Sequence, residues 1–225
     1  MVLVLVRAFV VRVAVICVAA AFAAGGSSSA ALAAGHVAAV RSKCLPDRPG
    51  VLVADDQAVA YRARNRLGQP EIFGCSYRRG RSYALGAAPE CTASGCGGVE
   101  GGPVLAGSIV AYELQDSSPC CDSWVVFVRD LRSGRLLHRL PTGAARSSSE
   151  VGGGFTAGLV VKADGAVAWI TAGGVARGGN QVHVVDRAGS RVVASGTDVA
   201  ERSLALSGST LYWTQAGKPF STTIN

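Results

Sequence analysis

The residue types that most often carry out catalysis are sparse in this sequence. Only three histidines occur: His36 near the N-terminus, and His138 and His183 in segments where apolar residues alternate. His183 and Asp186 would be the base and acid of a hydrolase triad, but their odd spacing of three residues directs the two side chains to opposite faces of a regular strand. The chain has no G-x-S-x-G, H-E-x-x-H, EF-hand or Walker sequence. We therefore predict no catalytic residue, no metal site and no cofactor.

A polar segment between Tyr112 and Trp124, which we interpret as a loop, is a candidate cation site. Its carboxylates belong to Glu113, Asp116 and Asp122. Calcium accepts oxygen ligands of this kind from loops. The three acids have no fixed ligand spacing, however, so we favour the alternative of a solvated turn held by a disulfide bond.

Six arginines give the clearest prediction of a binding site. Three of them are spaced by two residues, so they share one face of an extended segment, and three more lie at the turn of the next hairpin. Guanidinium groups suit phosphate and carboxylate, and aromatic rings offer stacking surfaces. We expect the six to form one positive surface for an anionic wall polymer or glycan; the alternative is a charged outer strand that resists edge pairing. The predicted ligand-binding residues are Arg62, Arg64, Arg66, Arg78, Arg79 and Arg81, with Tyr61, Tyr77 and Tyr83 between them.

Seven cysteines are present, and one of them, Cys17, lies in an N-terminal apolar run. The six that remain are an even number, so in an oxidising compartment they could form up to three disulfide bonds. The six disulfide candidates are Cys44, Cys75, Cys91, Cys96, Cys120 and Cys121.

Two pairs of these cysteines suggest particular bonds. Cys91 and Cys96 bracket a Gly-rich segment, which makes a local bond plausible. The adjacent Cys120 and Cys121 either bond to each other or go to separate partners such as Cys44 and Cys75. We favour separate partners, because a disulfide between adjacent residues forces unusual backbone geometry.

Residues 1–34 are predicted to be a signal peptide. Arg7 and Arg12 precede an apolar run over residues 13–24, and an A-x-A cleavage sequence follows at residues 31–33. The run is too short to span about 30 Å of hydrocarbon, so we expect no membrane span after cleavage. The sequence therefore predicts a secreted protein, extracellular or associated with the cell wall, whose residues 35–225 form a single domain.

Four similar segments organise that domain. Each begins as a strand, an Asp, Gly or Ser turn, and a second strand that ends in an aromatic residue: Tyr61, Tyr112, Trp169 and Trp213. A further hairpin follows in the first three segments, giving four strands in about 50 residues. We therefore expect these four aromatic side chains to be buried between neighbouring sheets. The repeats cover about residues 50–86, 103–141, 157–196 and 203–225.

A unit of four strands and about 50 residues is typical of a β-propeller blade. The composition agrees with an all-β fold, because valine, alanine and glycine are abundant and only one methionine is present. The hydrophobic content of 49% excludes a disordered chain, and 29 glycines without a three-residue period exclude collagen. We predict a β-propeller-like array of about four four-stranded antiparallel blades.

The fourth repeat stops one strand short, after residues 220–224. Propellers often complete their ring with a strand from the other terminus, and residues 36–43 are the natural donor here. A partial propeller completed by a partner, and a two-sheet sandwich, are the alternatives.

Two segments resemble known propellers. Residues 211–215 (Leu-Tyr-Trp-Thr-Gln), followed by Gly217, Lys218 and Pro219, are similar to the YWTD repeat of low-density-lipoprotein-receptor-type propellers, with Gln215 in place of the usual Asp. Residues 182–186 with Gly189 resemble the outer hairpin of many bacterial secreted propellers. Those families bind proteins or glycans, or act as enzymes, so the resemblance implies a fold without choosing a function.

The net charge of +7 makes anions the natural ligands. Our first interpretation is a secreted binding module without catalysis of its own, for an anionic polymer, a glycan or a protein; outside the cell we expect no nucleic acid. The alternatives are an extracellular hydrolase or lyase acting on a polymer, and a structural wall-associated protein.

Overall fold

The computed structural model describes residues 43–46, 49–88, 90–92, 95–118, 121–142, 146–147, 155–172 and 178–225. The predicted signal peptide lies outside these residues. So does the predicted donor strand, except for Lys43, which is not in a strand. Within the described residues, no helix has the length and apolar character of a membrane span.

The protein is all-β and contains four antiparallel sheets. The first sheet has the order β1-β2-β3-β4, with β1 (Gly50–Ala54), β2 (Ala58–Arg64), β3 (Pro70–Ser76) and β4 (Arg81–Ala87). The third sheet has the order β11-β12-β13-β14, with β11 (Phe155–Val161), β12 (Val167–Ala172), β13 (Asn180–Asp186) and β14 (Gly189–Gly196). The fourth has three described strands in the order β15-β16-β17: β15 (Ala205–Ser207), β16 (Thr210–Gln215) and β17 (Lys218–Thr223).

The second sheet is larger and has the order β10-β8-β7-β6-β5, with β9 also paired to β8. Its strands are β5 (Glu90–Thr92), β6 (Gly95–Ala106), β7 (Ile109–Ser118), β8 (Cys121–Asp130), β9 (Leu136–Pro141) and β10 (Arg146–Ser147). The ladder between β7 and β8 continues to the pair Ser118 and Cys121. The interpretation of the segment between Tyr112 and Trp124 as a loop is therefore wrong. Strand pairing with β8 extends through these polar residues, and Asp116, Ser117 and Ser118 lie opposite Ser123, Asp122 and Cys121.

Aspartates shape several of the hairpin turns. The Asp55 carboxylate accepts hydrogen bonds from the backbone N–H groups of Gln57 and Ala58, each at 2.8 Å. Asp186 accepts one from Ala188 at 2.9 Å, before Gly189 at a φ of 101°. Such Asx turns reverse the chain in few residues and favour glycine where φ is positive. They explain why the Asp and Gly positions marked the hairpins in the sequence.

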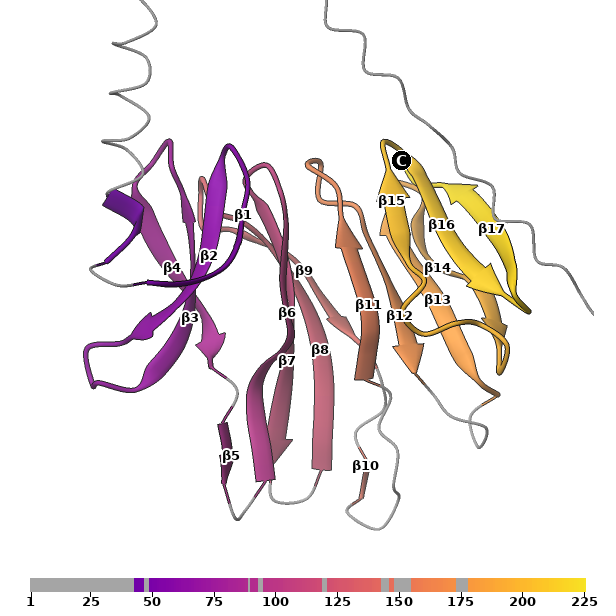
Figure 1. Cartoon of the computed structure of the whole chain (residues 1–225), viewed down its shortest axis with the longest axis horizontal. Coiled ribbons are helices and arrows are strands. Elements are labelled where there is room, and N and C mark those ends of the chain that lie inside the picture. Colours follow the sequence, from indigo (N-terminus) through magenta and orange to yellow (C-terminus); the bar gives the residue numbers. More distant parts are fainter. Residues whose placement is uncertain are drawn as a thin grey trace, which may run out of the picture.

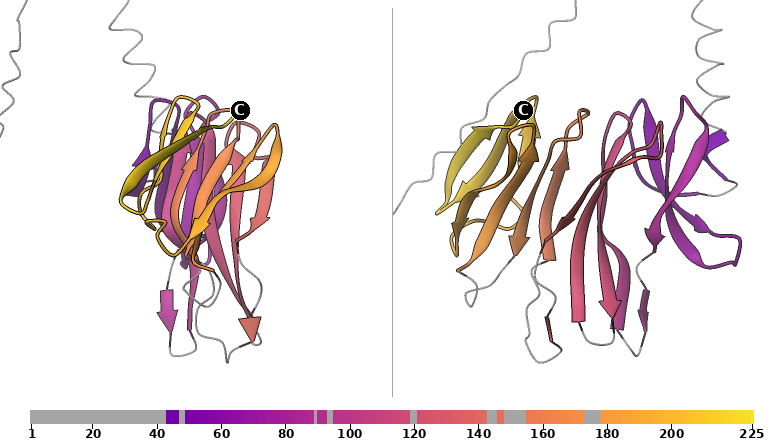
Figure 2. Two further views of the ribbon diagram at one scale, coloured as in Figure 1. Left: turned by 90° about the vertical axis from the view of Figure 1, so that its right-hand side faces the viewer. Right: turned by 180° about the vertical axis from the view of Figure 1, so that it is seen from behind.

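The sheets follow one another in chain order along the long axis of the molecule (Figures 1 and 2). The first and fourth sheets lie at opposite ends, and the described residues do not close into a ring. Three apolar cores join the sheets face to face, and each takes residues from two consecutive sheets. The first strands also adjoin, β1 beside β6, β6 beside β11 and β11 beside β15.

The four aromatic residues singled out in the sequence lie within β2, β7, β12 and β16 and are all buried; the predicted packing between neighbouring sheets is confirmed for three of them but not for Tyr61. Tyr61, Tyr112, Trp169 and Trp213 have exposed fractions of 4%, 1%, 3% and 6%. Each stacks on a ring directly opposite it on the following strand, at centroid distances of 5.7, 5.5, 4.9 and 6.0 Å. We call these the ring pairs: Tyr61–Phe73, Tyr112–Phe127, Trp169–His183 and Trp213–Phe220.

In each pair after the first, the buried ring on the earlier strand, which is Tyr112, Trp169 or Trp213, belongs to the core shared with the preceding sheet. The first sheet has no preceding sheet, and Cys44 and Leu45 cover its ring pair instead. Cys44 is fixed there by a disulfide bond to Cys75 on β3. The predicted pairing of Cys44 and Cys75 with Cys120 and Cys121 is therefore wrong.

The far face of the fourth sheet has a different character. Where β12 presents Ala168 and Ile170 to the next sheet, β16 presents Thr210, Tyr212 and Thr214. Tyr212 is 42% exposed. The described stack thus ends in a hydroxyl-rich face that water can cover.

Candidate ligand-binding site

The six predicted arginines lie on the first sheet in two groups that the fold keeps apart. In the ladder, Arg62 and Arg64 pair with Ile72 and Pro70, at the start of β3, whereas Arg81 pairs with Ser76 at its end. Because β3 has seven residues, the groups are about 20 Å apart. The expectation of one contiguous positive surface is wrong, since successive turns of an antiparallel sheet lie at opposite ends.

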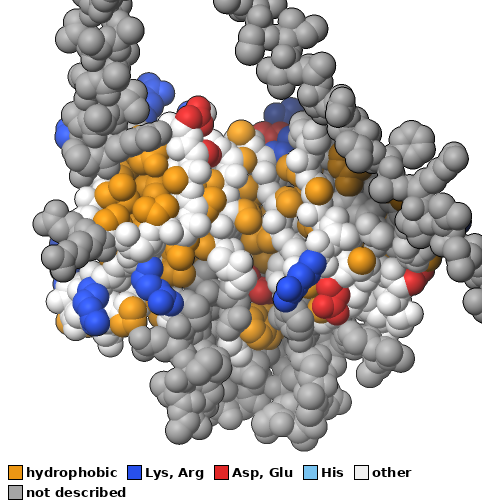
Figure 3. All heavy atoms as spheres, viewed as in Figure 1, with side chains coloured by type: hydrophobic (Ala, Val, Ile, Leu, Met, Phe, Trp, Pro, Cys, Tyr) orange, Lys and Arg blue, Asp and Glu red, His pale blue; other side chains and the backbone are white. Residues whose placement is uncertain are grey.

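The first group borders a hollow of about 380 Å³ on the β2–β3 hairpin. Figure 3 shows basic side chains gathered over this end of the first sheet. The residues that line the hollow, which we call the hairpin hollow, are Arg64, Asn65, Arg66, Leu67, Glu71 and Phe73.

Asn65 shapes the turn that carries the two arginines. Its side-chain oxygen accepts hydrogen bonds from the backbone N–H groups of Leu67, at 2.9 Å, and Gln69, at 3.0 Å. The Arg64 guanidinium donates to the carbonyl of Gly68 at 2.5 Å, where φ is 79°. These bonds fix the loop around the hollow and leave Leu67 82% exposed.

An aromatic ring and one carboxylate complete the hairpin hollow. Phe73 stacks on Tyr61, whose hydroxyl is hydrogen-bonded to Ser82 at 2.8 Å. Glu71 is the single acid in the lining, against Arg64 and Arg66, so the hollow has a net charge of +1. In the part of the chain that the structure describes, neither Arg62 nor Arg66 forms an ion pair.

The second group flanks the β3–β4 turn. Arg78, Arg79 and Arg81 are exposed, and the Arg81 guanidinium lies 5.2 Å from the centre of the Tyr83 ring. Lys43 lies against Gly80 in the same turn. None of these three arginines lines the hairpin hollow, which makes the second group a matched comparison for the first.

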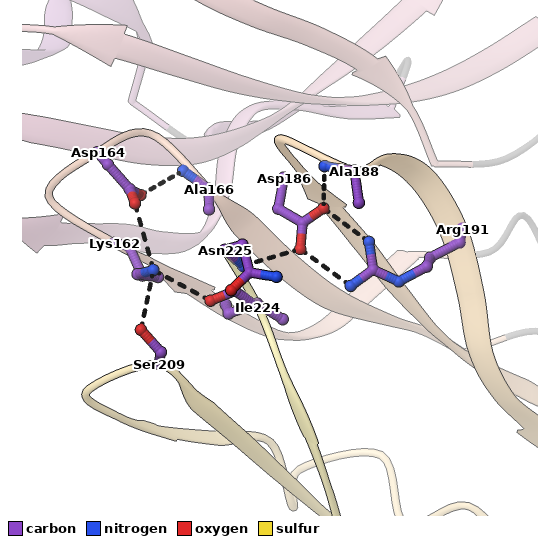
Figure 4. A network of polar contacts seen from close by, with 9 residues as sticks. All are labelled: Lys162, Asp164, Ala166, Asp186, Ala188, Arg191, Ser209, Ile224 and Asn225. Carbon is purple, nitrogen blue, oxygen red and sulfur yellow. Dashed lines mark hydrogen bonds and ion pairs between the residues drawn. The ribbon is translucent and has the colours of Figure 1, made fainter.

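The structure assigns His183 and Asp186 to separate environments. The His183 ring lies parallel to Trp169 at an angle of 4°, and burial lowers the pKa of its imidazole. Asp186 instead accepts hydrogen bonds from the Arg191 guanidinium at 2.7 and 2.9 Å and from Asn225 at 3.0 Å (Figure 4). The Arg191 side chain, above all, holds the pKa of Asp186 well below its usual range. The two residues do not form a catalytic pair.

Glu113, considered above as a calcium ligand, is buried and has a different set of partners. Its carboxylate accepts hydrogen bonds from the hydroxyl of Thr142 at 3.1 Å and from the backbone N–H and hydroxyl of Thr156 at 3.1 and 2.5 Å. It therefore links β7 to β11 of the next sheet. Among the described residues, no three His, Cys, Asp or Glu side chains are grouped as a metal site.

The side chains of Cys91, Cys96 and Cys121, and all of Cys120, lie outside the described part of the structure. The backbone register nevertheless sets Cys91 directly opposite Cys96 in the β5–β6 ladder. A local bond between them stays a prediction.

Comparisons with family models, with curated proteins and with solved structures found no match. What this chain does must therefore be inferred from its own residues.

Proposed function

We propose that the protein is a secreted, β-propeller-like binding module that holds an anionic wall polymer or glycan in the hairpin hollow. The observation that carries this proposal is the arrangement of Arg64, Arg66 and Phe73 around one open hollow. Guanidinium groups bind carboxylates and phosphates through paired hydrogen bonds, and the exposed Arg66 has no acidic partner among the described residues.

The other lining residues favour a sugar-based polymer over a simple polyanion. The Glu71 carboxylate would repel a dense row of anionic groups, but it can accept hydrogen bonds from sugar hydroxyl groups. Phe73 offers an apolar surface for the carbon face of a sugar ring. A glycan with both acidic groups and hydroxyls uses all three kinds of side chain.

A propeller-like architecture is part of the proposal. Its support is the order of the four sheets, the ring pair that recurs in each, and the neighbouring first strands. In a propeller the first strands of the blades lie innermost. The open arrangement of the described sheets favours a partial propeller over a closed ring.

The two arginine groups provide a matched test. We expect the variant R62Q/R64Q/R66Q to bind polygalacturonate or teichoic acid at least about tenfold more weakly than the native protein, since each charge-assisted hydrogen bond contributes about 1.5–3 kcal/mol. The control R78Q/R79Q/R81Q loses the same charge from the other end of the sheet and should keep most of the affinity. Binding should also weaken with salt, because charges are screened over about 8 Å at physiological ionic strength.

If both variants lost the same amount of affinity, binding would depend only on net charge. That result would contradict the proposal that the hairpin hollow is the binding site. Full affinity in R62Q/R64Q/R66Q for every acidic polymer that the native protein binds would refute the proposal. Neutral dextran is the ligand control, and calorimetry of binding is the measurement.

A further inference from the structure

A second pocket, of about 270 Å³, lies between the first and second sheets. Strand β4 contributes small residues to it, and β7, β8 and β9 contribute longer side chains. Its principal lining residues are Gly86, Ala87, Leu114, Gln115, Phe127 and Arg139. We call it the intersheet groove; it shares no lining residue with the hairpin hollow.

One cation is held over an aromatic ring in this groove. Arg139 is directly opposite Phe127 in the β8–β9 ladder, and its guanidinium carbon lies 5.9 Å from the ring centre. Phe127 is itself fixed by stacking on the buried Tyr112, at 5.5 Å and 14°. Stacking orients a guanidinium while leaving its N–H edges free for a carboxylate.

No acid of the described residues forms an ion pair with Arg139. The side chain is exposed, so a ligand can reach it from solvent. An anion would therefore meet a guanidinium that is already positioned and unpaired, which is the arrangement that charge complementarity requires.

The rest of the lining determines what the body of that anion must be. Leu114 and Phe127 are apolar, and Gln115 is the only other polar side chain among the lining residues. A ligand rich in hydroxyl groups would lose hydrogen bonds to water that this groove cannot replace, and each such loss weakens binding. A flat apolar ring has no such cost and gains from contact with Phe127.

We infer that the intersheet groove binds a small aromatic monocarboxylate of about the size of benzoate. The ring would lie against Phe127 and Leu114, and the carboxylate would accept hydrogen bonds from Arg139. Small-molecule sites commonly combine an apolar lining with a few polar groups that fix orientation. This site is independent of the polymer site proposed for the hairpin hollow.

The inference is tested by titrating the full secreted protein with sodium benzoate and measuring the changes in its NMR chemical shifts. We expect saturable binding to the native protein, and we expect R139Q to bind benzoate at least about tenfold more weakly. R135Q is the matched control, because Arg135 is exposed, precedes the same strand and does not line the groove. The neutral analogue benzamide should bind the native protein about tenfold more weakly than benzoate does.

The outcomes that overturn the inference are distinct from one another. No saturable binding of benzoate to the native protein would exclude the site. An R139Q variant with native affinity, or benzamide binding as tightly as benzoate, would exclude Arg139 as the anchor. A loss of benzoate binding in R62Q/R64Q/R66Q would locate the ligand in the hairpin hollow instead. Circular dichroism of each variant checks that the fold is intact.

Discussion

At position 183 a histidine takes the place that phenylalanine has in the other three ring pairs. Its Nε2 atom is buried and has no hydrogen-bond partner among the described residues. Burial lowers the pKa of the imidazole, so the folded protein binds this proton less readily than the unfolded chain does. Protonation therefore favours unfolding. The contribution of His183 to stability is complete above its unfolded pKa of about 6.5 and is lost as the pH falls below it.

The substitution His183→Phe should remove this acid sensitivity. We expect the variant to be about 1 kcal/mol more stable at pH 7.5, because a buried unpaired nitrogen is replaced by carbon. The advantage should grow at pH 5, where the native histidine must be protonated on unfolding. Urea unfolding at the two pH values measures both effects. A constant difference between them would show that His183 titrates alike in both states.

At the level of the sheet, the cover over the first ring pair depends on one disulfide bond. Cys44 and Cys75 are buried with Tyr61, and their bond connects the segment of residues 43–46 to β3, at a separation of 31 residues in sequence. We expect C44A/C75A to lose about 2–4 kcal/mol of stability. Hydrogen exchange should become faster in β1–β4 but stay unchanged in β11–β14, which do not contact the bond. Uniform acceleration across all sheets would contradict this local role.

Hairpins were the most predictable elements, because Asp and Gly turns act over a few residues. The ring partners were not predicted, since the separation in sequence varies with hairpin length: Phe73 follows Tyr61 by 12 residues, whereas Phe220 follows Trp213 by seven. A histidine at one of the four positions hid the pattern further. Only strand register reveals which rings face each other.

The arginine site was predictable in part for the same reason. Alternation correctly put Arg62 and Arg64 on one face of β2, because a strand has a period of two. The prediction that they form one surface with Arg78 and Arg79 failed, because the seven residues of β3 separate the two turns in space although the arginines are close in sequence. Glu113 was misjudged because its partner Thr156 is 43 residues away.

At the scale of the whole chain, export is the prediction that fixes the chemical environment. The mature protein should begin near Ala34 or Ala24 and should have few or no free thiols when it is secreted. Intact-mass spectrometry, with and without alkylation of native protein, measures both. A chain that retains Met1, or that alkylates at six cysteines, would contradict secretion through an oxidising compartment.

The polar network at the end of the stack stabilises the last sheet from outside its core. Lys162 donates to Ser209, at 3.2 Å, and to the carbonyl of Ile224, at 3.1 Å, while Asp186 receives the N–H of Asn225 (Figure 4). These bonds connect turns of the third sheet to a turn of the fourth sheet and to the two residues that follow its strand β17.

Since each core joins only consecutive sheets, the described stack is a one-dimensional chain of nearest neighbours. Under a pulling force applied along its long axis, such a chain would yield one sheet at a time, beginning with the sheet whose single interface is weakest. A protein built this way would unfold in steps under tension. Each sheet that was still folded would keep its own surface sites intact.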